Sequence, residues 1–238
     1  MRSLSNSDFL NQPIPLVSEF VGFCVAFVAS PLHATATHVR YRLVEALETF
    51  VPGFYDHDGR RRLASNQATC PERLTLLNAH PLSLRSLAPA MIRFYQDAEM
   101  SGSHTQFYDR FNMRMTVANI LGYALRYHSH RRALSGFADS KTSGSTMKRF
   151  CSHILNDVNH HFNEIEENLR SAQELVQSRE AGQWPPHEFA DRSKRLKQAL
   201  GIVKSWSFNL NHQLNLLADA CECAPLAFGA ADMAPRAA

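Results

Sequence analysis

Histidine and acidic side chains are concentrated in one stretch of this sequence. His153, Asp157 and His161 are spaced four residues apart, so on an α-helix they would share one face. Imidazole and carboxylate groups placed in this way can bind zinc or iron. In carboxylate-bridged helical bundles a second helix supplies matching ligands, whereas the later sequence offers only His187 and His212. We therefore expect ordinary surface histidines here, with a metal site as the alternative.

Other motifs that carry chemistry are absent from the sequence or incomplete. It contains no glycine-rich phosphate loop and no Gly-x-Ser-x-Gly nucleophile elbow. The five cysteines do not suit a disulfide framework, and Cys24 and Cys151 stand among apolar residues, as small core side chains do. Cys221 and Cys223 lack the two-residue spacer and the partner pair of a zinc site. We expect no catalytic residue, no cofactor and no bound metal.

Composition narrows the class of protein. Of the 238 residues, 45% are hydrophobic and 20% are charged, as in folded globular proteins. A formal net charge of +3 without a basic stripe argues against nucleic-acid binding. Residues 20–32 are uncharged but too few to span a bilayer, and Glu19 directly before them does not suit the alternative of a signal peptide. We expect no membrane partner, a reducing intracellular compartment, and a helix here that is buried on several sides.

Apolar residues recur with helical periodicity, and no convincing strand alternation is found. The pattern predicts helices at residues 15–30, 35–51, 71–79, 82–100, 105–127, 128–136, 145–180 and 187–221, with a loop at 52–70. Pro89 predicts that the fourth helix is divided into a short and a longer piece. The predicted fold class is all-α.

The last two predicted helices are long and are separated by a short break, so they predict an antiparallel helical hairpin. The core face of the first is predicted to be Phe150, Ile154, Val158, Phe162, Ile165, Leu169, Ala172 and Val176. Successive antiparallel helix pairs of unequal length fit an irregular, armadillo-like α-solenoid. We divide the chain into an N-terminal tail (1–14), a helical core (15–222) and a disordered tail (223–238).

One block of the sequence, residues 78–127, contains His80, Pro81, Arg93, Tyr95, Asp97, His104, Gln106, Phe107, Tyr108, Phe111, Asn112 and Arg114, followed later in the chain by Asn156 and Asp157. With these residues the block resembles the core of the ubiquitin elongation (conjugation) factors, a family of U-box ubiquitin ligases. The flanking helices are similar in pattern, so the resemblance covers nearly the whole chain. We expect the polar members to form hydrogen bonds between helices; a surface that contacts partners is the alternative.

The resemblance implies a scaffold in ubiquitin-dependent proteasomal degradation, including ER-associated degradation, in the cytoplasm, the nucleus or both. Family members lengthen ubiquitin chains on substrates that already carry ubiquitin, and no family residue forms a covalent intermediate. Their U-box recruits a ubiquitin-conjugating enzyme, and their core also binds a hexameric AAA segregase. These 238 residues include no U-box, so we expect no ligase activity from this chain alone. A non-catalytic helical adaptor outside the ubiquitin pathway and a helical metal-binding protein are the alternatives.

Overall fold

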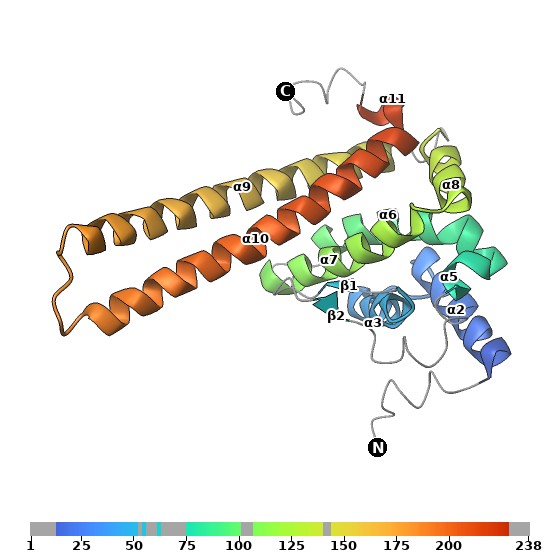
Figure 1. Cartoon of the computed structure of the whole chain (residues 1–238). Coiled ribbons are helices and arrows are strands. Elements are labelled where there is room, and N and C mark those ends of the chain that lie inside the picture. Colours follow the sequence, from blue (N-terminus) through green and yellow to red (C-terminus); the bar gives the residue numbers. More distant parts are fainter. Residues whose placement is uncertain are drawn as a thin grey trace.

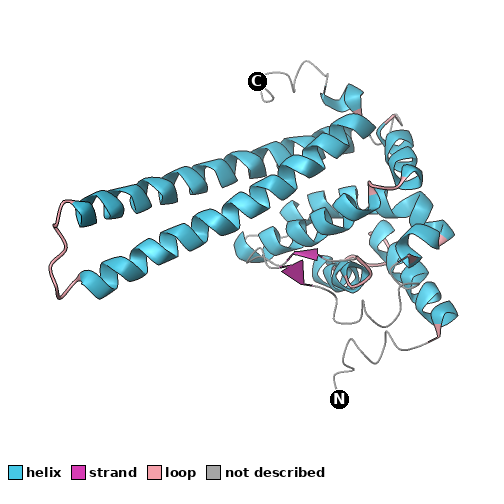
Figure 2. Cartoon of the chain, viewed as in Figure 1, coloured by secondary structure: helices cyan, strands magenta, loops and turns pink. Residues whose placement is uncertain are grey.

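The computed structural model describes residues 13–51, 54–55, 61–62, 75–100, 107–139 and 144–228, which form an all-α fold (Figures 1 and 2). The helices are α2 (Ile14–Ala29), α3 (Thr37–Glu48), α5 (Leu76–Ala79), α6 (Pro81–Met100), α7 (Phe107–Ala124), α8 (His128–Ala138), α9 (Gly144–Glu180), α10 (Phe189–Cys223) and α11 (Pro225–Phe228). Two short strands, β1 (Phe54–Tyr55) and β2 (Arg61–Arg62), pair antiparallel within the stretch predicted as a loop. The predicted fold class is confirmed, while the solenoid arrangement stays a prediction.

Helix α6 lies at the centre of a helical body. We define this body as α2, α3, α5, α6, α7 and α8 together with the adjoining parts of α9 and α10. Helix α6 packs against α2, α7, α8 and α9. Its side chains Leu87, Met91, Phe94 and Tyr95 are fully buried, as contacts on several sides require.

Pro89 lies inside α6 without dividing it. The predicted break is therefore wrong, because one helix runs from Pro81 to Met100. A proline in a helix interior removes one backbone hydrogen bond and costs about 3 kcal/mol. Burial of the neighbouring Leu87, Met91 and Phe94 offsets this cost, since each such side chain contributes about 1.5–3 kcal/mol.

Helix α2 buries only one of its faces. Val17 and Val21 on that face are fully buried, whereas Leu16 and Phe23 on the opposite face are exposed. The prediction of a helix buried on several sides is therefore wrong, because one side of the uncharged run faces solvent. None of the described helices is both long enough and apolar enough to cross a membrane.

Helices α9 and α10 form the predicted antiparallel hairpin, which extends well beyond the other described helices (Figure 1). Gly182 in the connecting turn has a φ of +68°, a conformation that glycine adopts at little cost. We call residues 162–206 the distal hairpin.

The predicted core face of α9 is buried only near the body. There the apolar side chains are enclosed: Phe150, Ile154 and Val158. Farther out, Ala172 is still buried, but three predicted core residues are exposed: Phe162, Leu169 and Val176. For these three the prediction is wrong, because α10 alone covers too narrow a stripe of α9 to bury them.

The chain stays helical beyond residue 222. Helix α10 continues to Cys223, which is buried together with Ala224, and α11 follows directly. The predicted start of a disordered tail at residue 223 is therefore wrong. The rest of that tail, residues 229–238, and residues 1–12 of the predicted N-terminal tail lie outside the described residues.

Candidate functional site

Three of the residues that carry the family resemblance meet where α9 joins the body. Tyr95 of α6 donates a hydrogen bond from its hydroxyl to Asp157 Oδ2 of α9 at 2.5 Å. The Arg114 guanidinium of α7 forms an ion pair with Asp157 Oδ1, and it lies 5.7 Å from the centroid of the Tyr95 ring. The side chains of Arg114 and Asp157 are each only 14% exposed, so solvent screens this pair little. We call this group the Asp157 node.

The environment of the Asp157 node keeps the Tyr95 hydroxyl protonated. Burial raises the pKa of Tyr95 well above its usual value, and the charge of Asp157 raises it further. The hydroxyl is therefore a permanent hydrogen-bond donor at physiological pH. Gln213 of α10 acts in the opposite direction and lowers the pKa of this hydroxyl, and its Nε2 donates to Met115 Sδ of α7 at 3.8 Å. The node itself links three helices, α6, α7 and α9.

A second ion pair, which sequence reasoning missed, ties α3 to α6. Arg40 of α3 is buried, and its guanidinium donates to Asp97 Oδ2 at 2.6 Å and to the Val28 carbonyl at 3.1 Å. The guanidinium also lies 5.1 Å from the centroid of the Phe94 ring. Asp97 belongs to the family motif, but Arg40 lies 57 residues earlier in the chain, outside the motif. Its position on the same helix face as two buried residues of α3, Val44 and Leu47, was the one available signal.

His80 fixes the start of α6 and its approach to α2. The His80 Nδ1 atom accepts a hydrogen bond from the Leu82 N–H at 3.2 Å, which satisfies one of the free donors at the helix start. Pro81 suits the first helical position because it has no N–H to leave unpaired. The His80 ring lies over Gly22 of α2, where an added Cβ would come within 2.8 Å of two ring atoms. Only glycine leaves room for the ring at this position.

The remaining motif residues do not gather at one place. Arg93 lies over the Phe137 ring of α8, 5.0 Å from its centroid, while Asn112 and Asn156 are exposed. The structure does not describe the side chains of three motif residues in the first turns of α7: Phe107, Tyr108 and Phe111. His104 and Gln106 lie outside the described residues altogether.

The three metal-ligand candidates on α9 serve different purposes. Asp157 is engaged by Tyr95 and Arg114. His161 is fully buried, so the expectation of a surface histidine is wrong for this residue. Its Nδ1–H donates to the Asp157 carbonyl, and its ring lies 4.9 Å from the Trp206 ring between centroids. Burial lowers the pKa of His161, which keeps it neutral. Among the residues that the structure describes, no three potential ligands, His153 included, are grouped to hold a metal ion.

Four of the cysteines are described, and none has the environment of a reactive thiol. Burial raises the pKa of Cys24 and of Cys151 to about 12. Burial also raises the pKa of Cys221 and Cys223. A protonated thiol is a poor nucleophile and a poor metal ligand. These side chains therefore act as apolar packing groups.

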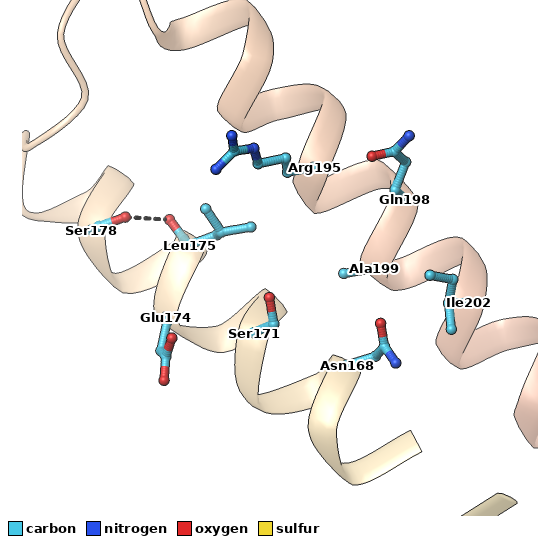
Figure 3. Close-up of a pocket in the computed structure, with 9 residues that line it drawn as sticks. All are labelled: Asn168, Ser171, Glu174, Leu175, Ser178, Arg195, Gln198, Ala199 and Ile202. Carbon is cyan, nitrogen blue, oxygen red and sulfur yellow. Dashed lines mark hydrogen bonds between the residues drawn. The ribbon is translucent and has the colours of Figure 1, made fainter. Parts of the chain in front are cut away.

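A pocket of about 470 Å³ opens between the two helices of the distal hairpin (Figure 3). It is lined by Asn168, Ser171, Glu174, Leu175 and Ser178 of α9 and by Arg195, Gln198, Ala199 and Ile202 of α10. Amide, hydroxyl, charged and aliphatic groups alternate along it, and Ser178 Oγ is engaged with the Leu175 carbonyl at 3.0 Å.

A second pocket, of about 440 Å³, lies where α8 meets the end of α10. It is lined by His128, Arg131, Arg132, Ser135, Glu222 and Cys223. Arg131 forms ion pairs with Glu222 and, at 3.4 Å, with Asp219. Of the two arginines in this pocket, Arg131 is therefore already neutralised by acidic residues of α10. The pocket thus has a lining of mixed charge and is not a strong anion site.

These features define a class of protein, an all-α protein whose helices are joined by buried polar groups. The family model described as the ubiquitin elongating factor core matches residues 3–238, and the chain belongs to that family.

Similar proteins have names that agree with this family. The chain is 30% identical over 209 residues to a probable ubiquitin conjugation factor E4 of Arabidopsis thaliana, covering 86% of this chain and 19% of the relative. It is 26% identical over 204 residues to the E4 ubiquitin-protein ligase UFD2 of Saccharomyces cerevisiae, covering 83% and 20%. A ubiquitin conjugation factor E4 of Schizosaccharomyces pombe is 27% identical over 136 residues, covering 57% and 12%. The chain thus spans a fifth or less of the length of these curated relatives.

Proposed function

We propose that this chain is a scaffold segment of a ubiquitin chain-elongation factor, which holds other proteins in position while ubiquitin is transferred between them. The proposal rests on the contacts that the motif residues form. Tyr95, Asp97, Arg114 and Asp157 join helices to one another instead of presenting reactive groups to a substrate. Orienting two reactants is sufficient for catalysis, because it replaces an encounter in solution by a reaction at high effective concentration.

The partners in this proposal are the proteins of the ubiquitin pathway. A ubiquitin-conjugating enzyme would be recruited through a U-box, and substrates that carry ubiquitin and an AAA segregase would contact the helical core. The proposed location is the cytoplasm, the nucleus or both. The match to the core family over residues 3–238 supports this reading over an adaptor outside the ubiquitin pathway.

The test is a chain-elongation assay with activating enzyme, conjugating enzyme and a substrate bearing a single ubiquitin. The 238-residue chain alone is expected to give no extension above a control without it, whereas the chain fused at its C-terminus to a U-box extends the ubiquitin chain. The matched control is the same U-box fused to an unrelated helical protein of similar size. Equal extension by both fusions contradicts the scaffold role, and extension by the unfused chain contradicts the non-catalytic role.

A further inference from the structure

Lysine and arginine are distributed unequally along this sequence. Of the 25 basic residues, 20 are arginines and five are lysines: Lys141, Lys148, Lys194, Lys197 and Lys204. The first 140 residues contain 14 arginines and no lysine, whereas the remaining 98 contain six arginines and all five lysines. A general preference for arginine would affect both parts of the chain alike, so it does not account for the difference between them.

Contacts explain only part of the arginine content of the body. Arg40 and Arg114 are largely buried and pair with carboxylates, a role for which the planar guanidinium is better suited than a lysine amine. Three other arginines on the surface of the body are exposed: Arg85, Arg126 and Arg132. At exposed positions solvent screens the charge, and a lysine would serve nearly as well. The structural role of arginine therefore does not explain why lysine is absent there.

The exposed lysines gather on one side of the distal hairpin. Lys194, Lys197 and Lys204 of α10 are all exposed. At about 100° and 1.5 Å per residue, they lie within about 80° of one another around the helix and within about 15 Å along it. They point about 140–160° away from Ala199, which is buried in the hairpin. The three amines thus form a strip on the side of α10 that is turned away from α9, which we call the lysine strip.

The arginines of the same helical segment are used differently from the lysines. Arg192 pairs with Glu188 at 2.7 Å, and Arg195 lines the pocket between the two helices. The three amines of the lysine strip, by contrast, form no ion pair with any residue that the structure describes. They are therefore not needed to hold the hairpin together.

Lysine differs from arginine in the reactions that it can undergo. A lysine amine can lose its proton and attack a carbonyl carbon, whereas a guanidinium stays protonated in proteins. Lysine is accordingly a target of ubiquitination. A surface that carries arginine in place of lysine keeps its positive charge but offers no amine to an activated carbonyl group.

We propose that the lysine strip is the site at which this chain itself accepts ubiquitin, and that arginine in place of lysine keeps the body unmodified. This inference rests on the proposed function, which brings a ubiquitin-conjugating enzyme loaded with ubiquitin close to the chain. The distal hairpin extends beyond the other described helices (Figure 1), so a ubiquitin attached there leaves the surfaces of the body accessible.

The reaction uses the thioester that joins the C-terminus of ubiquitin to the cysteine of the conjugating enzyme. The neutral Nζ of a lysine in the strip attacks the thioester carbonyl carbon. A C–N bond forms, the C–S bond breaks, and the cysteine leaves with the electron pair as a thiolate. The extra proton on the nitrogen passes through water to the thiolate, and the product is an isopeptide bond between ubiquitin and the lysine.

Discharge of a loaded conjugating enzyme onto the unfused 238-residue chain tests the acceptor sites, because it needs neither a U-box nor the scaffold role. Mass spectrometry of tryptic peptides maps the lysines that carry the Gly-Gly remnant of ubiquitin. Replacing Lys194, Lys197 and Lys204 together by Arg keeps the charge and is expected to lower the amount of attached ubiquitin about fivefold. The matched control is Lys148→Arg at a half-buried position of α9, which is expected to leave the amount unchanged.

This replacement also distinguishes an acceptor site from a positively charged surface that binds an acidic partner, because arginine would preserve such a surface. The proposal is overturned if the triple variant carries as much ubiquitin as the unaltered chain, or if Lys148→Arg causes the larger loss. Circular dichroism of each variant confirms that its helices are retained.

New lysines on the body test the role of the arginines. Arg85→Lys in α6 and Arg126→Lys after α7 each place an amine at an exposed position without changing the charge. Each is expected to accept ubiquitin to within about threefold of a lysine in the strip, since both kinds of position are exposed. New lysines that stay unmodified would show that the shape of the chain protects the body, which overturns the role given to arginine.

The fusion to a U-box separates this inference from the proposed function, because the two have different readouts in one reaction. Extension of ubiquitin on the added substrate reports the scaffold role, and remnants on the lysines of the chain itself report the acceptor sites. Extension together with self-modification outside the lysine strip overturns this inference and leaves the proposed function standing. Modification of the strip by direct discharge, without extension by the fusion, supports the acceptor sites and contradicts the proposed function.

Discussion

The helical body and the distal hairpin are built from the same kind of helix but are stabilised differently. In the body, Phe94, Tyr95 and Phe150 are fully buried, and the Asp157 node ties three helices together. In the distal hairpin the buried apolar side chains among the described residues are Ala172, Trp184 and Ala199. Helix α9 passes through both environments without a break. Helix α9 is thus held by a large buried core at the end that joins the body, and its other end depends on contacts around the connecting turn.

The far end of the hairpin is closed by a small cluster of its own. Trp184 Nε1 donates to Ser178 Oγ at 2.8 Å. The Arg179 guanidinium lies 5.7 Å from the centroid of the Trp184 ring and 5.5 Å from that of Phe189. Ion pairs one turn apart, such as Glu166–Arg170 at 2.8 Å, add a few tenths of a kcal/mol each. Contacts within the hairpin therefore take the place of a core here.

The largest expected effect comes from removing the acid of the Asp157 node. Asp157→Ala removes the carboxylate that the Arg114 guanidinium and the Tyr95 hydroxyl both contact at a largely buried site, which is expected to lower the free energy of unfolding by about 3–5 kcal/mol. Urea denaturation measures the change. The matched variant on the same helix is Glu166→Ala, whose ion pair with Arg170 is exposed and contributes less than about 1 kcal/mol. Equal losses in the two variants would contradict the distinction between body and distal hairpin.

Replacing one glycine in the body and one in the distal hairpin by alanine is expected to give the next largest difference in stability between the two regions. Gly22→Ala places a methyl group against His80 and is expected to destabilise the body by about 1–3 kcal/mol. Gly201→Ala in the distal hairpin meets no atom within 4 Å. It is expected to stabilise the protein by about 0.5–1 kcal/mol, because alanine favours the helix. Thermal denaturation compares the two, and a double variant that adds His80→Ala to Gly22→Ala recovers stability if the clash is the cause.

A half-buried acid in the body, Glu48, provides a pH-dependent test. Burial against α7 raises the pKa of Glu48 from 4.5 to about 6, although Asn119 donates a hydrogen bond to it at 2.7 Å. Between these values the folded state binds more protons than the unfolded state, so this group lowers stability as pH rises through 6. Glu48→Gln is therefore expected to gain up to about 2 kcal/mol at pH 7 and little at pH 4.5.

The comparison of Glu48→Gln with the unaltered chain isolates this one group. The buried His130 and His161 have lowered pKa values and act in the opposite direction, but they are present in both proteins and cancel. Chemical denaturation across the pH range supplies the measurement. A difference in the free energy of unfolding between the two proteins that does not grow with pH would show that Glu48 is not the titrating group.

The smallest effect is expected at the closed end of the hairpin. Arg179→Ala removes two contacts between a cation and an aromatic ring at a solvent-exposed site, at a cost of about 0.5–1 kcal/mol each. The change is expected to speed amide hydrogen exchange near the turn without altering exchange in α6. Faster exchange in both regions would show that the distal hairpin and the body unfold as one unit.

Sequence patterns predicted the helices well and their surroundings less well. The spacing of apolar residues located α9 and α10 to within a few residues, because periodicity reports which side chains share a face. It could not show whether a neighbour covers that face, which is why Phe162 and Leu169 were wrongly assigned to the core. The opposite error occurred at His161, a polar residue that is buried because Trp206 packs on it from another helix.

The polar site was only half predictable. Tyr95, Arg114 and Asp157 were singled out by their resemblance to a family, but their meeting depends on how three helices cross in space. Arg40 gave almost no signal, since its partner Asp97 lies on a different helix. Pairing between helices far apart in the sequence is a property of the assembled fold, and no local pattern contains it.

The packing of α2 on α6 has a consequence for synthesis on the ribosome. Helix α2 finds its main neighbour only when Met100 has been added, about 70 residues after its own last residue. Because translation adds ~5–20 residues per second, the valine-rich face of α2 stays uncovered for about 4–14 s before the helix that covers it is complete. During that interval the side chains of Val17, Val21 and Val25 form an exposed apolar surface on the nascent chain. Helix α2 is therefore a segment that a chaperone acting during translation would engage.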